Sequence, residues 1–380
     1  MQRIFLRKKS IIINALPLLS KLTGVGRYLY EVSKNIENYN INFKNYYYYG
    51  YFSTKLINNS KSNSSLQKFK SLIDKNQLLK KITRKLMIVF SNIFKKEFDI
   101  YWEPNFIPLD SIKAKKVITS VHDFSFVLYK DYHPKERIEY FEKNFFKNIY
   151  RSNYIICFSE FTKKEILNYI DIDENRVKVI YHGVDHKLFK VYKDKGLNFE
   201  LPESFIFCAG SIEPRKNLLG LLKAYNNLDK NLKNKYKLVL AGFKGWNNSD
   251  VLELIEKNRD NIIYLGYITD EELAKVYNLA TIFVYPSFYE GFGLPVLEAM
   301  ACGTAVITSN ISSLPEVGGD AVIYCNPYDV GDICNKIKML LTDENLQREL
   351  KIKGVKRAKQ FTWEKSAKEH IELFKWVMNE

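Results

Sequence analysis

Short apolar segments alternate along the chain with longer segments in which apolar residues recur every three or four positions. The short segments predict strands, and the longer ones, such as residues 27–36 and 160–169, predict amphipathic helices. In the first half of the chain the predicted strands are residues 10–15, 46–49, 116–121, 154–158 and 177–181. Strands that alternate with helices in this way indicate a parallel α/β sheet with helices on both faces.

The second half of the chain repeats the alternation. Its predicted strands are residues 205–209, 237–241, 261–265, 282–285 and 305–309. A chain of 380 residues exceeds what one hydrophobic core usually supports, so two doubly wound α/β domains are expected. Residues 187–202 mix polar and apolar side chains without a strand pattern, which is typical of a linker. We therefore predict one Rossmann-like domain over residues 1–186 and a second over residues 187–362.

Composition agrees with a globular protein and disfavours several other classes. Hydrophobic residues make up 46% of the chain and charged residues 27%, and no run approaches the roughly eighteen apolar residues that a membrane-spanning helix needs. Residues 11–19 follow basic residues as a signal peptide would, but Asn14 and Pro17 interrupt the run, so a first strand is favoured. The five cysteines form no C-x-x-C pair, which disfavours a disulfide framework and a zinc site and fits a reducing cytoplasm.

The formal net charge of +15 calls for an anionic partner. Nucleic acid is disfavoured, because the sequence has no zinc-finger spacing, no aromatic RNA-binding motif and no convincing helix-turn-helix pattern. The richest basic segment, residues 66–96, has helical periodicity and contains Lys80, Lys81, Arg84 and Lys85. Two interpretations stay open: an interfacial helix that contacts an anionic membrane, or an ordinary helix packed on its own domain with its lysines in water.

The most informative segment for function is residues 285–303, in which seven residues, including a glycine-rich turn, separate Glu290 from Glu298. An apolar strand precedes the turn, Gly291 and Gly293 let the backbone approach a ligand closely, and a helix is predicted to begin after them. The free N–H groups of a helix N-terminus suit a diphosphate. The alternative is a strand-turn-helix without a ligand, in which an unpaired Glu298 among apolar residues would be costly.

This segment resembles the E-x7-E signature of the retaining glycosyltransferases of family 4. Those enzymes have the GT-B fold, in which two Rossmann-like domains face a central cleft, and the resemblance spans nearly the whole chain. It implies that Glu290 lies near the donor sugar and that Glu298 binds the ribose of a sugar nucleotide. It also implies donor contacts from the turn and helix start, namely Gly291, Phe292, Gly293 and Leu294. The terminal helix, about residues 363–380, is expected to join the first domain.

Two further motifs follow predicted strands of the first half, where ligands bind in doubly wound sheets. Gly24 and Gly26 precede a helix and form either an anion cradle or no more than a turn and a helix start. The resemblance implies that both glycines contact the donor, whereas Arg27 either does the same or only begins the helix. A lone histidine such as His122 is often structural, but the resemblance implies that it hydrogen-bonds the donor sugar, with Asp123 orienting it.

A third motif, residues 210–217, follows the first strand of the second half. Arg215 and Lys216 stand at a helix entry, where positive charge is unfavourable unless an anion is bound. A guanidinium can hold two phosphate oxygens, and an ammonium can neutralise a leaving diphosphate. In the resembling enzymes an arginine directly follows the glycine. Ser211 stands there in this chain, so Arg215 is expected to take over that role.

The resemblance further implies that the backbone around Tyr267 cradles the nucleobase. No metal cofactor is expected, because the only D-x-D sequence, residues 171–173, lies in a polar turn away from the glycine motifs. Arg215, Lys216 and the helix N-terminus at Leu294 are expected to stabilise the leaving diphosphate instead.

Together these features predict a metal-independent hexosyltransferase. It would move a sugar, with retention, from a nucleoside diphosphate to a hydroxyl of a lipid-linked or oligosaccharide acceptor, in the synthesis of O-antigen, capsule or exopolysaccharide. GDP-mannose is the favoured donor, because residues 210–217 resemble the motif of mannosyltransferases, and a UDP- or dTDP-sugar is the alternative. The expected location is the cytoplasm, with peripheral contact at the inner face of the membrane. A GT-B-like sugar-nucleotide epimerase and a nucleotide-sugar-binding protein without turnover are the other classes.

Overall fold

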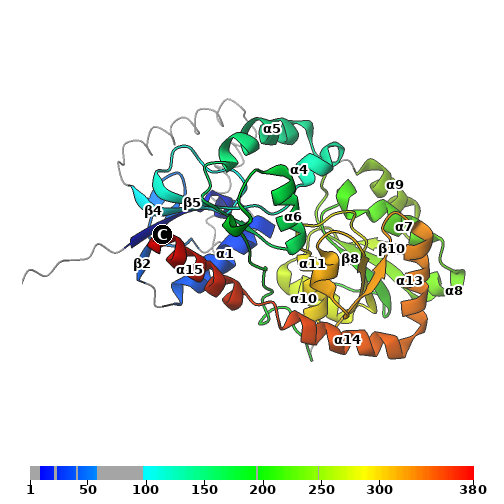
Figure 1. Ribbon diagram of the computed structural model, residues 1–380. Helices are drawn as coiled ribbons and strands as arrows, with labels where there is room; N and C mark the ends of the chain where they lie inside the picture. The colour runs from blue at the N-terminus through cyan, green and yellow to red at the C-terminus, as the bar shows by residue number, and fades with distance from the viewer. Residues whose placement is uncertain (1–8, 21–23, 40–41, 58–96, 194–195, 247) are drawn as a thin grey trace, which may run out of the picture.

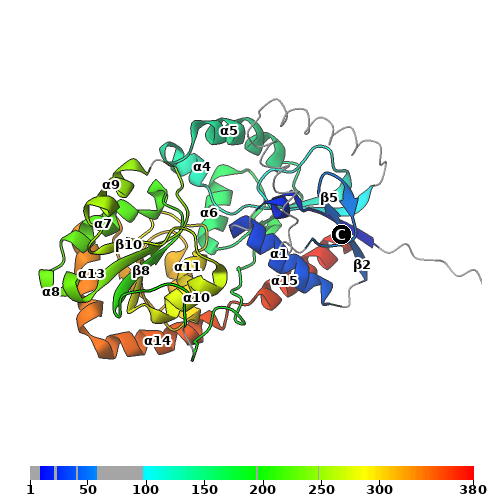
Figure 2. The same ribbon diagram turned by 180° about the vertical axis from the view of Figure 1, so that it is seen from behind.

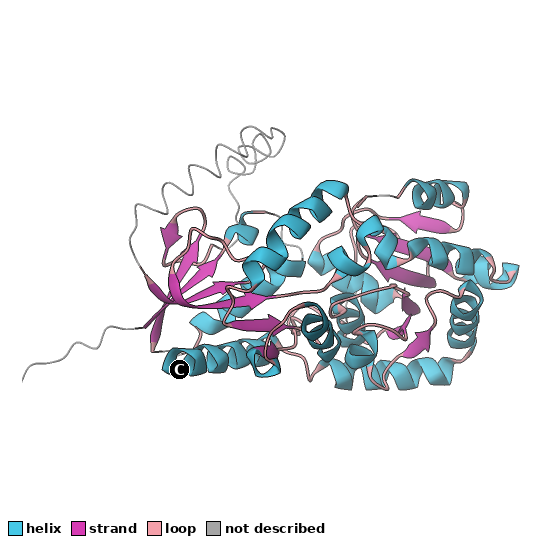
Figure 3. Ribbon diagram, turned by 45° about the horizontal axis from the view of Figure 1, so that its top comes forward, coloured by secondary structure: helices cyan, strands magenta, loops and turns pink. Residues whose placement is uncertain are grey.

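The computed structural model describes residues 9–20, 24–39, 42–57, 97–193, 196–246 and 248–380. Their strands form two sheets, each flanked by helices, in two halves that lie side by side (Figure 1; Figure 3). The basic segment 66–96 lies outside the described residues. No helix within the described ranges is both long and apolar enough to cross a bilayer.

The first sheet has seven strands in the order β3-β2-β1-β4-β5-β6-β7. Neighbouring strands are parallel, except that β3 runs antiparallel to β2. The strands are β1 (Lys9–Asn14), β2 (Phe43–Tyr48), β3 (Phe52–Ser53), β4 (Phe98–Glu103), β5 (Ala114–Ser120), β6 (Tyr154–Cys157) and β7 (Val177–Val179). The helices described in this half are η1 (Leu16–Leu19), α1 (Gly24–Glu37), α4 (Ser125–Leu128), η3 (Lys130–Tyr132), α5 (Lys135–Ile149), α6 (Glu160–Tyr169) and η4 (Glu174–Arg176).

The second sheet has six parallel strands in the order β10-β9-β8-β11-β12-β13. They are β8 (Phe205–Ala209), β9 (Lys237–Ala241), β10 (Ile262–Tyr264), β11 (Ile282–Tyr285), β12 (Ala305–Ser309) and β13 (Ile323–Cys325). The helices are η5 (Pro214–Lys216), α7 (Leu218–Asn226), α8 (Lys230–Lys235), α9 (Ser249–Lys257), α10 (Asp270–Leu279), α11 (Leu294–Ala301), α12 (Leu314–Gly318), α13 (Val330–Thr342), α14 (Glu344–Ala358) and α15 (Trp363–Asn379).

The central strands are apolar on both sides, as a parallel sheet covered on both faces requires. Every residue of β8 and β12 is buried. In β1, Ile11 and Ile13 pack into one apolar cluster, and Ile12 packs into another, because successive side chains of a strand point to opposite faces. The preference for a strand at this position is therefore confirmed.

Strand β4, which lies between β1 and β5, was not predicted from the sequence. Its sequence, FDIYWE, carries two acidic residues that interrupt the apolar pattern. In the folded chain Glu103 is buried and accepts hydrogen bonds from Asn14 Nδ2 at 2.8 Å and from the Tyr101 hydroxyl at 2.5 Å. Asp99 accepts from the backbone N–H of Ser10 at 2.9 Å. Partners on the neighbouring strand thus offset the cost of placing acidic side chains in a central strand.

The terminal helix α15 leaves the second half and packs against α1 of the first (Figure 1; Figure 2). The Tyr28 hydroxyl of α1 hydrogen-bonds His370 Nε2 of α15 at 2.7 Å. Where the chain passes from the first half to the second, Gly183 lies against the start of α15: a Cβ at Gly183 would stand 2.2 Å from Trp363 N. The chain therefore passes from the first half to the second, and back again, at one place. The two passages lie near residues 183 and 363, close to the predicted domain limits at 186 and 362.

Candidate active site

The turn between β11 and α11 reaches across to the first half of the molecule. Gly293, with φ +117°, stands directly before the first residue of α11, Leu294. The Gly291 carbonyl accepts a hydrogen bond from Ser159 Oγ at 2.9 Å. A Cβ at Gly291 would stand 1.9 Å from the His122 carbonyl oxygen. Glycine is required at 291 because the two halves touch there, and this contact brings the turn to the strand end that carries His122.

Glu290 is buried and paired with both cations of the loop after β8. Its Oε2 accepts from Arg215 Nη1 at 2.9 Å, and its Oε1 accepts from Lys216 Nζ at 2.7 Å. The Tyr285 hydroxyl also donates to Oε1, at 2.8 Å. Burial by itself raises the pKa of Glu290, but the charges of Arg215 and Lys216 outweigh it and hold the pKa at about 2. Glu290 is therefore ionised at neutral pH.

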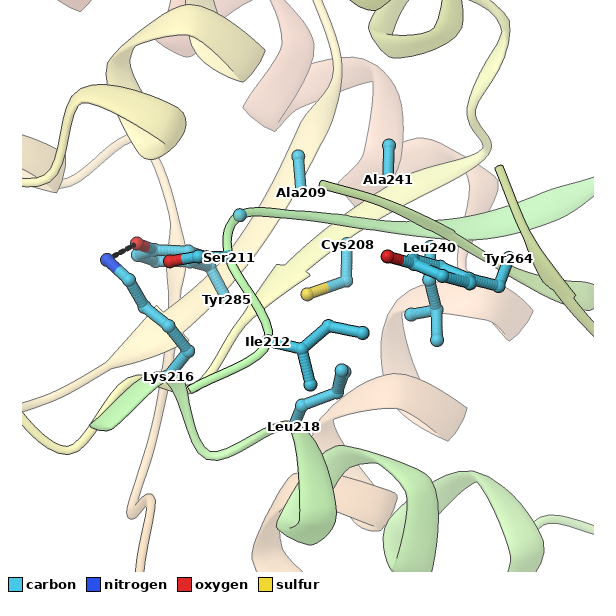
Figure 4. A pocket seen from close by; sticks show the side chains of 11 residues that line it. Cys208, Ala209, Ser211, Ile212, Lys216, Leu218, Leu240, Ala241, Tyr264 and Tyr285 are labelled. Carbon is cyan, nitrogen blue, oxygen red and sulfur yellow. Dashed lines mark hydrogen bonds between the residues drawn. The ribbon is translucent and has the colours of Figure 1, made fainter. Parts of the chain in front are cut away.

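Hydrogen bonds from the loop after β8 to neighbouring segments hold the two cations in place. Arg215 and Lys216 end the short helix η5, and Asn217 follows it in the left-handed region, with φ 54°. The Asn217 side chain caps α7 and donates to two backbone carbonyls on neighbouring loops. Arg215 Nη1 also donates to the Tyr289 carbonyl at 2.6 Å. Figure 4 shows Lys216 directed at the Tyr285 hydroxyl, 2.6 Å away, beside a small pocket at the ends of β8 and β9.

Glu298 pairs across the two halves with Arg27 of α1. Arg27 Nη1 donates to Glu298 Oε1 at 2.8 Å, and Arg27 Nη2 contacts Asp270 Oδ1 at 2.5 Å. Burial raises the pKa of Glu298 to about 7, although the charge of Arg27 acts in the opposite direction. Arg27 therefore does more than begin α1, because its side chain connects that helix to α10 and α11.

His122 lies at the carboxyl end of β5 and keeps part of its surface exposed. Its Nε2 is 2.8 Å from the Pro104 carbonyl oxygen. Since a carbonyl oxygen only accepts, Nε2 carries the proton in this contact. Burial lowers the pKa of His122 to about 4, so the ring is neutral at pH 7 and its Nδ1 is an acceptor. The expectation that Asp123 orients the ring is wrong: Pro104 holds it, and Asp123 Oδ1 accepts instead from Ser125.

The remaining predicted donor contacts lie around Glu290, Glu298 and His122. Gly24 and Gly26 form the first turn of α1, next to Arg27. Tyr267 follows β10, three residues before Asp270, and 51% of its surface is exposed. Phe292 is buried, and its ring packs edge-on against His182 with centroids 5.2 Å apart. The Phe292 side chain is thus part of the core, and a donor contact at this position falls to its backbone.

We call Glu290 and the residues bonded around it, namely Arg215, Lys216, Tyr285 and Glu213, the Glu290 cluster. Two of these residues, Tyr285 and Glu213, were not predicted from the sequence. Tyr285 bonds both Glu290 and Lys216 through its hydroxyl, yet its sequence context marks it only as the end of an apolar strand. Glu213 is buried, and its Oε1 accepts from Arg215 Nη2 at 3.1 Å. Their positions in the sequence could have identified them, because both residues stand where strand ends meet the glycine motifs.

In the part of the chain that the structure describes, no group of three or more His, Cys, Asp or Glu side chains is placed to hold a metal ion. In the D-x-D sequence, Asp173 Oδ1 accepts from the backbone N–H of Asn175 at 2.8 Å and so caps η4. The predicted role of that sequence as a turn is confirmed.

Two family models match the chain. The model for "Glycosyl transferases group 1" matches residues 192–357, which contain β8 to β13 and the Glu290 cluster. The model for "Glycosyltransferase Family 4" matches residues 77–188, which contain His122. The matched ranges together include residues from both sides of the candidate site.

Curated relatives and a solved structure agree with these matches. The chain is 36% identical over 284 residues to O-antigen chain mannosyltransferase B of Escherichia coli, covering 73% of this chain and 74% of that protein. It is also 36% identical over 282 residues to the serotype-specific mannosyltransferase WbdA of Escherichia coli, covering 70% of this chain but 34% of WbdA. Sucrose-phosphate synthase from Thermosynechococcus elongatus has a similar fold, with a TM-score of 0.71 at 18% identity, covering 98% of this chain and 100% of that one. The chain thus belongs to the glycosyl transferases group 1, as a glycosyltransferase with the GT-B fold.

Proposed function

We propose that this glycosyltransferase moves mannose from GDP-mannose to a hydroxyl of a glycan acceptor during the synthesis of a surface polysaccharide. The names of its relatives support the sugar and the product, since both are mannosyltransferases with 36% identity and one of them is named as an O-antigen chain mannosyltransferase. The observation that carries the proposal is the Glu290 cluster, in which a buried carboxylate is held ionised between Arg215 and Lys216. Such a cluster offers one negative group to a sugar cation and two positive groups to a leaving diphosphate.

Donor binding, in this proposal, exchanges the partners of the charged side chains. Arg215 and Lys216 turn from Glu290 to the diphosphate oxygens, to which a guanidinium donates two hydrogen bonds and an ammonium adds charge. Glu298 accepts hydrogen bonds from the ribose hydroxyls in place of Arg27. The backbone N–H groups at Leu294 and at the Gly24–Gly26 turn face the same anion. The diphosphate gains charge as it leaves, so these contacts strengthen in the transition state.

The contacts with the donor sugar fall to Glu290 and His122. With its two cations engaged by phosphate, Glu290 stabilises the positive charge that develops at the sugar carbon. His122 is neutral, with Nε2–H bound to Pro104, so Nδ1 accepts a hydrogen bond from a sugar hydroxyl. Transfer with retention and without a metal ion belongs to the same proposal, and so does peripheral contact of the basic segment 66–96 with an anionic membrane. All five cysteines are buried free thiols, which supports a reducing compartment such as the cytoplasm.

The test is a donor screen with product analysis. The protein is incubated with GDP-mannose, UDP-glucose or dTDP-glucose, with and without α-mannoside acceptors, and with and without EDTA. We expect release of GDP and a new α-mannosyl linkage, identified by NMR, only with GDP-mannose and acceptor, and at the same rate in EDTA. Interconversion of a sugar nucleotide without acceptor would show an epimerase, transfer from another donor would correct the sugar, and loss of activity in EDTA would overturn metal independence.

A further inference from the structure

Four aromatic rings meet at the junction of the two halves, and we call them the aromatic platform. Tyr129 and Tyr132 come from the chain after α4, and Phe288 and Tyr328 come from loops after β11 and β13. The rings of Phe288 and Tyr328 are stacked, with centroids 5.0 Å apart and planes 24° apart. Tyr132 lies 6.2 Å from Phe288, and Tyr129 lies 5.4 Å from Tyr132. The rings therefore form one continuous surface that both halves of the molecule supply.

The platform is partly open to solvent. Tyr328 is 64% exposed, and the other three members are partly exposed. The cation beside the platform is already paired, because Lys130 of η3 contacts Glu142 at 2.6 Å, and the same short helix carries the acidic Asp131. Contiguous apolar surface that a fold leaves uncovered is more often a binding surface than a packing defect.

The backbone connects the platform directly to the candidate reaction centre. The Phe288 N–H donates to the Arg215 carbonyl at 2.9 Å, and Arg215 itself holds Glu290. Tyr289, the residue between Phe288 and Glu290, packs against Tyr129 with ring centroids 5.2 Å apart. In the β11–α11 turn, the predicted donor contacts Gly291 to Leu294 follow Glu290, whereas Phe288 of the platform precedes it. A molecule that contacts Phe288 therefore lies two residues along the chain from Glu290.

The chemistry of the platform fits a sugar ring. A pyranose has an apolar C–H face and a rim of hydroxyls, and tyrosine offers the matching combination of an apolar face and a polar edge. The hydroxyls of Tyr129 and Tyr328 lie 3.2 Å apart, so the polar edges of the two rings gather at one place. An acyl chain cannot form hydrogen bonds with these hydroxyls, and an anion would require cations, which the platform does not present.

We infer that the aromatic platform is a subsite for the acceptor glycan, which binds the sugar residue next to the one that receives the new linkage. The inference rests on the proposed function in one respect, namely that the acceptor is a glycan. It goes beyond that function because it predicts that the enzyme prefers acceptors of at least two sugar rings. Tyr328 and Phe288 are the main contacts of the second ring.

The test compares a short acceptor with a longer one. Methyl α-mannopyranoside and α-linked mannotriose are used as acceptors, with GDP-mannose as donor, in the wild type and in Tyr328→Ala, Tyr328→Phe and Tyr150→Ala. Tyr150 is a matched control, because it is 57% exposed and lies at the end of α5 outside the platform. We expect Tyr328→Ala to raise KM for mannotriose about tenfold while KM for the monosaccharide, KM for the donor and kcat stay unchanged. Tyr328→Phe should keep most of the affinity because it keeps the ring.

Saturation-transfer NMR with mannotriose alone gives a second readout that needs no turnover. We expect contact signals from the wild type and from Tyr150→Ala, and their loss in Tyr328→Ala. If the wild type transfers no mannose but binds mannotriose through Tyr328, the proposed donor fails and the platform stands. The platform is overturned if Tyr328→Ala binds mannotriose as the wild type does. It is also overturned if Tyr328→Phe behaves like the alanine variant. The affinity would then depend on the contact between the Tyr129 and Tyr328 hydroxyls, which only joins the two halves, and not on the ring.

Discussion

At the scale of single residues, the two glutamates of the E-x7-E segment are buried in opposite electrostatic environments. Glu290 has two cations and a tyrosine hydroxyl on its oxygens, and its pKa falls to about 2. Glu298 has one cation, shared with Asp270, and burial raises its pKa to about 7. One carboxylate is therefore permanently charged, while the charge of the other depends on its partner near neutral pH.

Glu298→Gln should weaken the binding of GDP. The variant keeps the size of the side chain but replaces a charged acceptor with a neutral one, so about 1.5–3 kcal/mol of binding free energy is expected to be lost. Isothermal titration calorimetry with GDP measures this, with Glu256→Gln on the exposed helix α9 as the control. An unchanged Kd in the Glu298 variant would remove the ribose from the proposed contacts of this residue.

Glu298 should also give the fold a pH dependence of defined sign. Its pKa of about 7 in the folded chain lies above the ordinary value of 4.5, so the folded chain binds more protons than the unfolded chain between these two values. The free energy of unfolding is therefore expected to fall as the pH rises from 4.5 to 7, by about 3 kcal/mol from this group. Urea unfolding of the wild type and of Glu298→Gln across this range tests it. Parallel pH profiles of the two proteins would show that Glu298 does not contribute.

At the scale of elements, the β11–α11 turn works because glycine lets it touch β5. Gly291→Ala would place a Cβ 1.9 Å from the His122 carbonyl oxygen, so either the turn or the end of β5 must move. We expect transfer activity to fall at least tenfold and the melting temperature to drop by several degrees, as overpacking usually costs about 1–3 kcal/mol.

Gly24→Ala is the matched control for the fold. A Cβ at Gly24 meets no atom within 4 Å, and alanine favours the helical conformation that Gly24 adopts in α1. Its melting temperature should therefore equal or exceed that of the wild type. Equal melting temperatures for the Gly291 and Gly24 variants would mean that the contact between the turn and β5 is loose.

At the scale of the whole molecule, α15 fastens the end of the chain onto the first half. The Tyr28 hydroxyl stands between His370 Nε2 at 2.7 Å and Ser120 Oγ at 2.9 Å, and all three residues are buried. This network joins α15, α1 and the end of β5, one position before Val121 and two before His122. A polar network of this kind stabilises only when every member is paired.

Tyr28→Phe should therefore destabilise the protein by about 1–3 kcal/mol, because it leaves His370 and Ser120 each without one buried partner. Chemical unfolding measures the change, and Tyr30→Phe, on the same helix but partly exposed, should have little effect. If both variants unfold like the wild type, the attachment of α15 depends on its apolar contacts alone.

The order of most strands and helices and the motifs at the strand ends could be predicted from the sequence alone, and the resemblance to family 4 implied the GT-B fold. Those features are local: an apolar run such as that of β8, a glycine before a helix and a pair of glutamates at fixed spacing each carry their signal within a few residues. Tertiary structure alone decided the rest. It placed β4 in the centre of a sheet despite two acidic residues, because Asn14 and Ser10 pair with them from the next strand.

Tertiary structure also decided which charge meets which. Arg27 and Glu298 are 271 positions apart, and Lys216 and Glu290 are 74 apart, so no local pattern records either pair. The exposed stack of Phe288 and Tyr328 is likewise invisible along the chain. Strand ends bring these residues together because parallel sheets gather all their carboxyl ends at one edge, and the pKa values follow from the burial and the charges that this assembly creates.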